Sequence, residues 1–226
     1  MDIHALIEPA RAVGGDFYDF ALVDDHRLFF MIGDVSGKGV PASLFIALSK
    51  VLAKSAALRE PANIGAALTR ANAEIARENA AAMFVTLYAG VLDLRDGALQ
   101  SVNAGYDAPF LLSPGREPRR LDSDGRPPLC VVEDFPYPTE HGRLEPDDAL
   151  VLLTDGVTEA QNADGDLFGL PAVMRTLEAA PAGATAAEVA AALRDAVNGH
   201  AAGAEPADDV TFLVVRWSGA APPTAP

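Results

Sequence analysis

The sequence predicts an α+β fold in which mostly antiparallel sheets are flanked by pairs of helices. The prediction rests on the order of the expected elements along the 226-residue chain: a strand, a helix pair, several strands, a second helix pair and a last strand. Strands and helices do not alternate one by one, which argues against a doubly wound parallel sheet. Half of the residues are hydrophobic, enough for one domain with a sizeable core.

The first half of the chain contains the first helix pair. An apolar run at 27–35 predicts a buried strand that ends beside Asp34, and the run at 41–58 predicts a helix with Pro41 in its first turn. A second helix is predicted at 62–79. One face of the first helix is marked by apolar residues at helical spacing, namely Leu44, Ala47, Leu48, Val51 and Leu52.

The second half predicts a hairpin, further strands and the second helix pair. Asp96-Gly97 is a turn signal between strands at 83–94 and 98–105. The other predicted strands are 3–10, 109–113, 148–156, which is apolar and ends at an aspartate, and 208–217; the predicted helices are 169–180 and 185–201. We therefore expect one domain over 1–217 and a disordered tail over 218–226.

The charge and the cysteine content limit the classes of protein to consider. Lys and Arg total 17 and Asp and Glu total 32, so the formal net charge is −15, which disfavours binding to nucleic acid or anionic lipid. Cys130 is the only cysteine, so no internal disulfide can form. No signal peptide is visible, and no apolar run approaches the roughly 20 residues of a membrane span. The expected location is the cytoplasm.

The stretch "GDVSGKG" at 33–39 looks like a phosphate-binding loop but departs from that motif. A Walker loop requires glycine where Ile32 stands, and a hydroxyl residue after Lys38, where the chain has Gly39. Two of the four fixed positions therefore disagree, and a glycine turn between strand and helix remains as the structural alternative.

Two other stretches resemble motifs that they do not complete. "GGDFYDF" at 14–20 is similar to the GGDEF signature of diguanylate cyclases, but Phe17 occupies the place of a required carboxylate, so a cyclase stays a minor alternative. "NADGDLFG" at 162–169 has the acid spacing of a calcium loop, but Leu167 stands where that loop requires glycine. A hairpin turn is predicted there instead.

Four aspartates lie where apolar runs begin or end: Asp16, Asp34, Asp155 and Asp208. Single carboxylates at such places are usually turn or capping residues, but four of them suggest a shared site. Clustered carboxylates repel one another unless cations neutralise them, and hard divalent cations such as Mg²⁺ or Mn²⁺ prefer oxygen ligands. No histidine shares these motifs, so zinc is disfavoured.

A series of motifs then identifies a family that the sequence resembles. In chain order they are "PARAVGGDFYDF", "GDVSGKGVPASL", "NAEI", "MFVTL", "VNAG", "LVLLTDGVTEAQN", "FG" and "DDVTFLVV". The sequence resembles the SpoIIE/RsbU-type phosphatases, a bacterial branch of the metal-dependent type 2C (PPM) Ser/Thr protein phosphatases. The resemblance covers about residues 9–216, and the complete set in order is highly specific.

The resemblance implies a fold, a cofactor and a reaction. The fold would be an α-β-β-α sandwich, with two Mn²⁺ or Mg²⁺ ions in a cleft at one end. By motif, Asp34 would bridge both ions, Asp16 and the Val35 carbonyl would complete one site, and Asp155 and Asp208 the other. A metal-activated water would then hydrolyse phosphoserine or phosphothreonine without a covalent enzyme intermediate.

The resemblance leaves open one ligand position, the effect of two departures from the family motifs, and the function itself. Asp209 would replace Asp208 as a ligand if the register of "DDVT" were shifted by one. The family's "NAGH" appears here with Tyr106 in place of histidine, and its "PLG" appears with Cys130 in place of glycine. The implied partners are a phosphorylated anti-sigma-factor antagonist of the STAS type as substrate and an upstream sensor or receiver domain, and homodimer formation is left open. A pseudophosphatase that binds a partner without catalysis is the alternative function.

Overall fold

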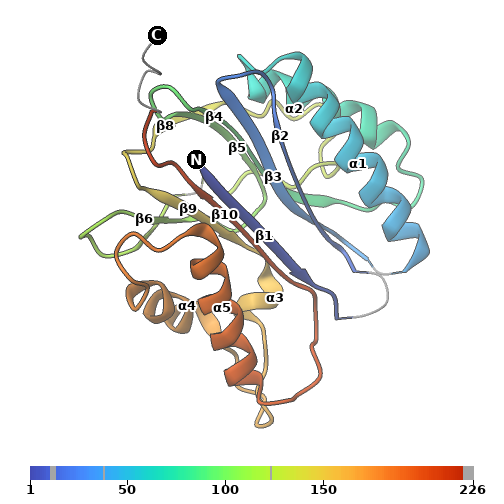
Figure 1. The fold of residues 1–226 in the computed structure, drawn as a ribbon. Coiled ribbons are helices and arrows are strands. Elements are labelled where there is room, and N and C mark those ends of the chain that lie inside the picture. The colour runs from blue at the N-terminus through green and yellow to red at the C-terminus, as the bar shows by residue number, and fades with distance from the viewer. Residues whose placement is uncertain (11–13, 38, 123, 221–226) are drawn as a thin grey trace.

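Two antiparallel five-stranded sheets lie face to face in the computed structural model, which describes residues 1–10, 14–37, 39–122 and 124–220. Helices cover the outer face of each sheet (Figure 1). The predicted α-β-β-α sandwich is therefore confirmed. The predicted disordered tail lies largely outside the described residues, which end at residue 220.

Sheet B has the strand order β2-β3-β4-β5-β8, and helices α1 (Val40–Arg59) and α2 (Ile64–Arg77) pack against it. Its strands are β2 (Asp16–Leu22), β3 (Arg27–Val35), β4 (Val85–Asp93), β5 (Ala98–Ala104) and β8 (Glu140–Arg143). The predicted hairpin at Asp96-Gly97 joins β4 to β5, and Gly97 has the positive φ that the turn requires.

Sheet A has the strand order β1-β10-β9-β6-β7, so the first and last strands of the chain are neighbours. Its strands are β1 (Asp2–Glu8), β6 (Phe110–Leu112), β7 (Arg119–Arg120), β9 (Ala149–Leu153) and β10 (Val210–Arg216). Helices α4 (Gly169–Glu178) and α5 (Ala186–Ala201) cover its outer face, and the short α3 (Asp155–Thr158) follows β9.

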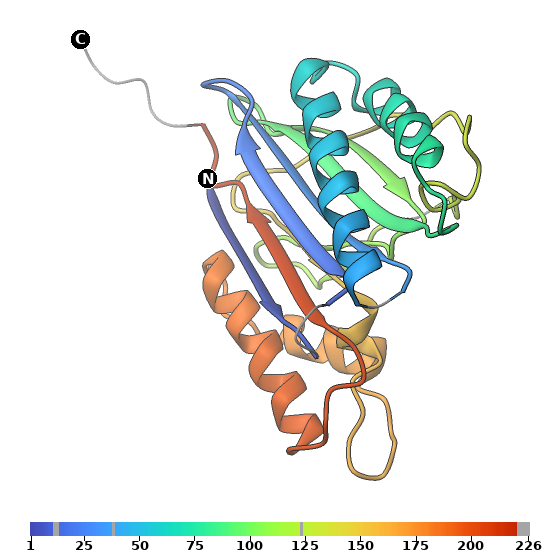
Figure 2. The ribbon, with the colours of Figure 1, turned by 90° about the vertical axis from the view of Figure 1, so that its right-hand side faces the viewer.

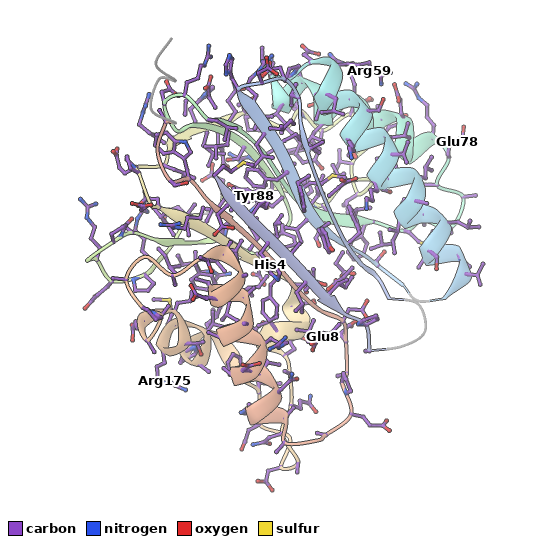
Figure 3. The ribbon with its side chains drawn as sticks, viewed as in Figure 1. His4, Glu8, Arg59, Glu78, Tyr88 and Arg175 are labelled. Atoms are coloured by element: carbon purple, nitrogen blue, oxygen red, sulfur yellow. The ribbon has the colours of Figure 1, made fainter. Side chains whose placement is uncertain are left out.

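Three apolar layers hold the sandwich together, one under each helix pair and one between the sheets. Figure 2 shows the ribbon of the two sheets between their helices. The layer between the sheets contains Phe30 and Ile32 of β3, and Leu152 and Leu213 from the opposite sheet. Tyr88 also belongs to this layer (Figure 3). Alternate residues of each strand face this layer, so the residues that follow the same alternation at the strand ends face the gap between the sheets.

Helix α1 packs on a face that only partly matches the one that the apolar spacing indicates: Leu48 and Leu52 of that face lie against the core, but other residues of it are exposed. Leu44 and Val51 are 69% and 63% exposed. The buried residues are instead mostly small: Ala42, Phe45, Ser49, Ala53, Ala56 and Ala57. The helix is apolar on nearly every side, so spacing alone does not single out the packed face, and alanines allow close approach to the sheet. α1 is long and apolar enough to cross a membrane by length and composition, but its alanine face belongs to the core under sheet B.

After β9, one predicted boundary is wrong and one predicted turn is confirmed. The predicted strand at 148–156 ends earlier, at Leu153, because Asp155 begins α3. The predicted hairpin turn at 162–169 is confirmed, since the Asn162 N–H donates to the Asp166 carbonyl at 3.1 Å and Gln161 pairs with Leu167.

Candidate metal centre

Asp16 and Asp34 face each other across two neighbouring strands of sheet B. The register of β2 and β3 pairs Asp16 with Asp34 directly, and the next pair on the same face is Tyr18 with Ile32. Ile32 belongs to the layer between the sheets, so both carboxylates point toward the gap between the sheets at one end of the sandwich. Side chains paired in this way have Cβ atoms about 5 Å apart.

The "GGD" turn before β2 is built for close approach to these carboxylates. A Cβ on Gly14 would overlap the Asp209 carboxylate, and a Cβ on Gly15 would meet the Asp34 carboxylate and lie 3.0 Å from the Val35 carbonyl oxygen. The Val35 N–H donates to the Gly15 carbonyl at 3.1 Å. Glycine is required at both positions because no side chain fits between the backbone and the acids.

Sheet A contributes its acids from the ends of β9 and β10. Asp155 lies two residues after β9 at the start of α3, and Asp208 lies two residues before β10. Thr154, which is 2% exposed, donates from Oγ1 to Oδ2 of Asp16 at 2.7 Å and accepts from the Thr211 N–H at 3.1 Å. A hydroxyl of sheet A therefore holds a carboxylate of sheet B.

Asp209 uses its carboxylate differently from the other acids. Its Oδ1 accepts from the Ala10 N–H at 2.8 Å, and its Oδ2 accepts from the N–H groups of Gly15 at 2.6 Å and Asp16 at 3.3 Å. The side chain is 2% exposed and ties the start of β10 to the "GGD" turn. The preceding acid, Asp208, accepts the Asp209 N–H on its Oδ1 at 2.9 Å.

Burial and mutual repulsion perturb the titration of these acids. Burial raises the pKa of Asp16 to about 8, an effect that hydroxyls of Thr211 and Thr154 partly offset and the charge of Asp34 increases. Burial, followed by the charge of Asp155, raises the pKa of Asp34 to about 7. The pKa of Asp155 is also raised, by burial and then by Asp208. Each charge acts on its neighbours, so the acids of the two sheets form one electrostatic cluster.

The donor set of this cluster fits hard divalent cations. All its side-chain donors are carboxylate oxygens, the Val35 carbonyl lies beside them, and no described Lys or Arg forms an ion pair with Asp16, Asp34 or Asp155. In the part of the chain that the structure describes, no three His, Cys, Asp or Glu side chains already converge tightly enough to hold an ion.

Some of the residues that shape the site were not singled out by the sequence. Thr154 stands inside the "TDG" motif, but a threonine beside an aspartate carries no sequence pattern that predicts its hydrogen bond to Asp16. The anchoring role of Asp209 depends on contacts with residues almost 200 positions earlier in the chain, which no local pattern shows. The predicted acids Asp16, Asp34, Asp155 and Asp208 do lie together at one end of the sandwich.

The architecture and the acidic cluster define the class of protein as the PP2C-type phosphatase fold. The chain belongs to the SpoIIE family: the model of that family, described as "Stage II sporulation protein E (SpoIIE)", matches residues 24–218. Among curated relatives, Protein IcfG of Synechocystis sp. is 33% identical over an alignment of 239 residues that covers 94% of this chain and 37% of IcfG. Phosphoserine phosphatase RsbU of Bacillus subtilis is 29% identical over 172 residues, which is 74% of this chain and 49% of RsbU.

Solved structures agree on the fold. The SiaA-PP2C domain of Pseudomonas aeruginosa has a TM-score of 0.81 at 24% identity, covering 95% of this chain and 85% of that one. RsbX, solved in complex with magnesium, has a TM-score of 0.69 at 17% identity, covering 95% of each chain. This chain spans less than half the length of the two curated relatives.

Proposed function

We propose that this chain is a metal-dependent protein phosphatase that hydrolyses phosphoserine or phosphothreonine. The observation that carries the proposal is that carboxylates of both sheets lie at one end of the sandwich: Asp16 pairs with Asp34 in sheet B, and Thr154, the residue between β9 of sheet A and Asp155, donates a hydrogen bond to Asp16. Buried like charges are unfavourable unless cations compensate them, and carboxylates are the ligands that Mg²⁺ and Mn²⁺ prefer. Similarity to RsbU, whose name records a phosphoserine phosphatase, supports the reaction.

The roles of the acids follow from their places in the cluster. Asp34 is the proposed bridge between two Mn²⁺ or Mg²⁺ ions. It lies opposite Asp16 on sheet B, and beyond the effect of burial the charges of Asp155 and Asp208, beside sheet A, raise its pKa. Asp16 and the Val35 carbonyl would complete one ion site, and Asp155 and Asp208 the other. The magnesium complex of RsbX, which has the same fold, is consistent with such an ion.

Between the two candidates in "DDVT", the contacts favour Asp208 as the ligand. Both carboxylate oxygens of Asp209 already accept backbone N–H groups, so binding an ion there would leave buried donors without partners. We therefore assign Asp209 to anchoring the turn that carries Asp16.

In the proposed reaction, bound divalent ions lower the pKa of a water so that it can attack phosphorus near neutral pH. The residues of this chain hold the oxygen donors in place for that chemistry. Thr154 fixes the orientation of Asp16 through its 2.7 Å hydrogen bond, and Asp209 fixes the backbone beneath it. The acids also keep the site negative, so a phosphoprotein binds productively only after cations have offset that charge.

The substrate and the regulation of the enzyme form the finer part of the proposal. A phosphorylated anti-sigma-factor antagonist of the STAS type is the proposed substrate, which would place the enzyme in cytoplasmic control of a sigma factor. An upstream sensor or receiver domain in a longer chain would regulate it, and a homodimer is one possible assembly. The family membership supports these assignments.

The test is hydrolysis of p-nitrophenyl phosphate with Mn²⁺ and then with EDTA, followed by phosphorylated STAS proteins from the same genome. Asp34→Asn is the site variant. Asp19→Asn is the matched control, because Asp19 lies on β2, the strand next to that of Asp34, but pairs with Lys54 at 2.8 Å and Lys50 at 3.7 Å, on α1. Manganese-dependent turnover by the wild type and by Asp19→Asn, but not by Asp34→Asn, would support the proposal. A wild type that binds the phosphoprotein without hydrolysing it would indicate a pseudophosphatase.

A further inference from the structure

The side chain of Tyr106 is buried at the inner side of the acidic cluster. It is 6% exposed and belongs to the layer between the sheets. Four carboxylates raise its pKa beyond the effect of burial, and among them Asp16 acts most strongly, followed by Asp107, Asp155 and Asp34. The strand register places Tyr106 at the same end of sheet B as these acids, because Gly105 bridges Leu87 of β4, and Leu87 pairs with Gly33, the residue before Asp34.

The hydroxyl of Tyr106 has no hydrogen-bond partner among the described residues. A buried hydroxyl without a partner costs free energy, and phenylalanine would fill the same volume without that cost. A phenol can both donate and accept hydrogen bonds, and carboxylates that bind a divalent cation are ionised and can only accept them. The hydroxyl is therefore a donor placed beside acceptors.

The "NAG" motif before Tyr106 fixes this placement. The Asn103 amide donates to the Tyr106 carbonyl at 2.9 Å and accepts the Tyr106 N–H at 2.8 Å. Gly105 has a φ of 71° and approaches Pro128 so closely that a Cβ would overlap the proline ring. The backbone at residue 106 is thus held in one conformation, and the side chain points inward from a rigid turn.

We propose that Tyr106 is a positioning residue for the metal-ligating carboxylates, and that its hydroxyl donates a hydrogen bond to Asp16 when divalent ions draw the acids together. This inference rests on the proposed metal centre. Thr154 already donates to one oxygen of Asp16, so a second donor would fix the orientation of the carboxylate. Outer hydrogen bonds of this kind orient ligands and typically change metal affinity by about 10–100-fold.

The proposal predicts opposite effects of one substitution on two properties. Tyr106→Phe removes only the hydroxyl, so the metal-free protein should keep or slightly raise its melting temperature, because a buried donor without a partner is lost. The same variant should bind Mn²⁺ about 10–100-fold more weakly by calorimetric titration. Addition of Mn²⁺ should also perturb the near-ultraviolet tyrosine spectrum of the wild type, and Tyr106→Phe should lose that signal.

Tyr88→Phe is the matched control. Tyr88 is a buried tyrosine of the same layer, but its hydroxyl interacts with Ser101, and none of the acids of the cluster perturbs its pKa. This variant should lower the melting temperature equally with and without Mn²⁺ and leave Mn²⁺ affinity unchanged.

Three results would overturn the inference. Equal Mn²⁺ affinity of the wild type and Tyr106→Phe would refute the role of Tyr106 while leaving the metal centre intact. An equal loss of affinity in Tyr88→Phe would show a general effect of the core. A wild type that binds no Mn²⁺ would refute the proposed function and this inference with it.

Discussion

Replacement of Asp209 by alanine should lower the stability of the metal-free fold. Its main effect should not be on the affinity for metal. The substitution removes both oxygens that accept the N–H groups of Ala10, Gly15 and Asp16, two of them at 2.8 Å or less. Hydrogen bonds to a charged acceptor contribute about 1.5–3 kcal/mol each. With two strong bonds and one long one, we expect a loss of about 3–5 kcal/mol, which is large for a single substitution.

The matched variant is Asp208→Asn. It keeps an acceptor for the Asp209 N–H and removes one like charge from the surroundings of Asp34 and Asp155. We expect the metal-free protein to change its melting temperature by at most a few degrees, whereas Mn²⁺ affinity should fall strongly because a proposed ligand is lost.

Thermal unfolding in EDTA and calorimetric titration with Mn²⁺ together test this difference. For a chain of this size about 1 kcal/mol corresponds to roughly 2–4 °C, so Asp209→Ala should melt roughly 10 °C lower than the wild type. If Asp209→Ala kept its metal-free stability but lost Mn²⁺, and Asp208→Asn kept Mn²⁺, the two roles would be the reverse of those assigned here.

The remaining predictions concern the same site. Asp34→Asn should lower turnover roughly a thousandfold or more while keeping the fold, since one carboxylate serves both ions, and retention of half the rate would refute the bridge. Gly14→Ala should lower the melting temperature, because its Cβ would overlap the Asp209 carboxylate; an unchanged melting curve would contradict that close approach. In EDTA, stability should fall as pH rises from about 5 to about 8: Asp16 and Asp34 have folded pKa values of about 8 and about 7 against 3.8 for the free group, so unfolding releases protons in this window. Mn²⁺ should remove most of that fall, as melting curves at pH 5 and pH 8 would show.

Most of the fold could be predicted because the apolar patterns and turn residues that indicate each element lie within or beside that element in the sequence. The strand 27–35 matches β3 residue for residue, since nearly every one of its side chains is apolar and buried. The Asp96-Gly97 turn and the helix 185–201 could also be predicted, and the structure shows that α5 begins with a capping box of Thr185 and Glu188. The packed face of α1 could be predicted only in part, because its apolar residues surround the helix and alanines, which carry a weak hydrophobic signal, make the contact.

The acids of the site could be predicted, but the different roles of Asp208 and Asp209 could not. The sequence indicates Asp16, Asp34, Asp155 and Asp208 because each lies at the end of an apolar run beside glycine or another acid. The distinction between Asp208 and Asp209 depends on which carboxylate oxygen accepts a hydrogen bond from which backbone N–H group. Only the tertiary structure determines these contacts. The environment of Tyr106 could likewise not be predicted, because Asp16, Asp34 and Asp155 lie far from it in the sequence.

The central claim is that the acids of the two sheets form a centre for two divalent ions. The most direct measurement is an anomalous difference map from crystals grown with Mn²⁺. The account predicts two peaks about 3.5–4 Å apart on either side of the Asp34 carboxylate, one near Asp16 and one near Asp155 and Asp208. A map without a peak beside Asp34 would contradict it.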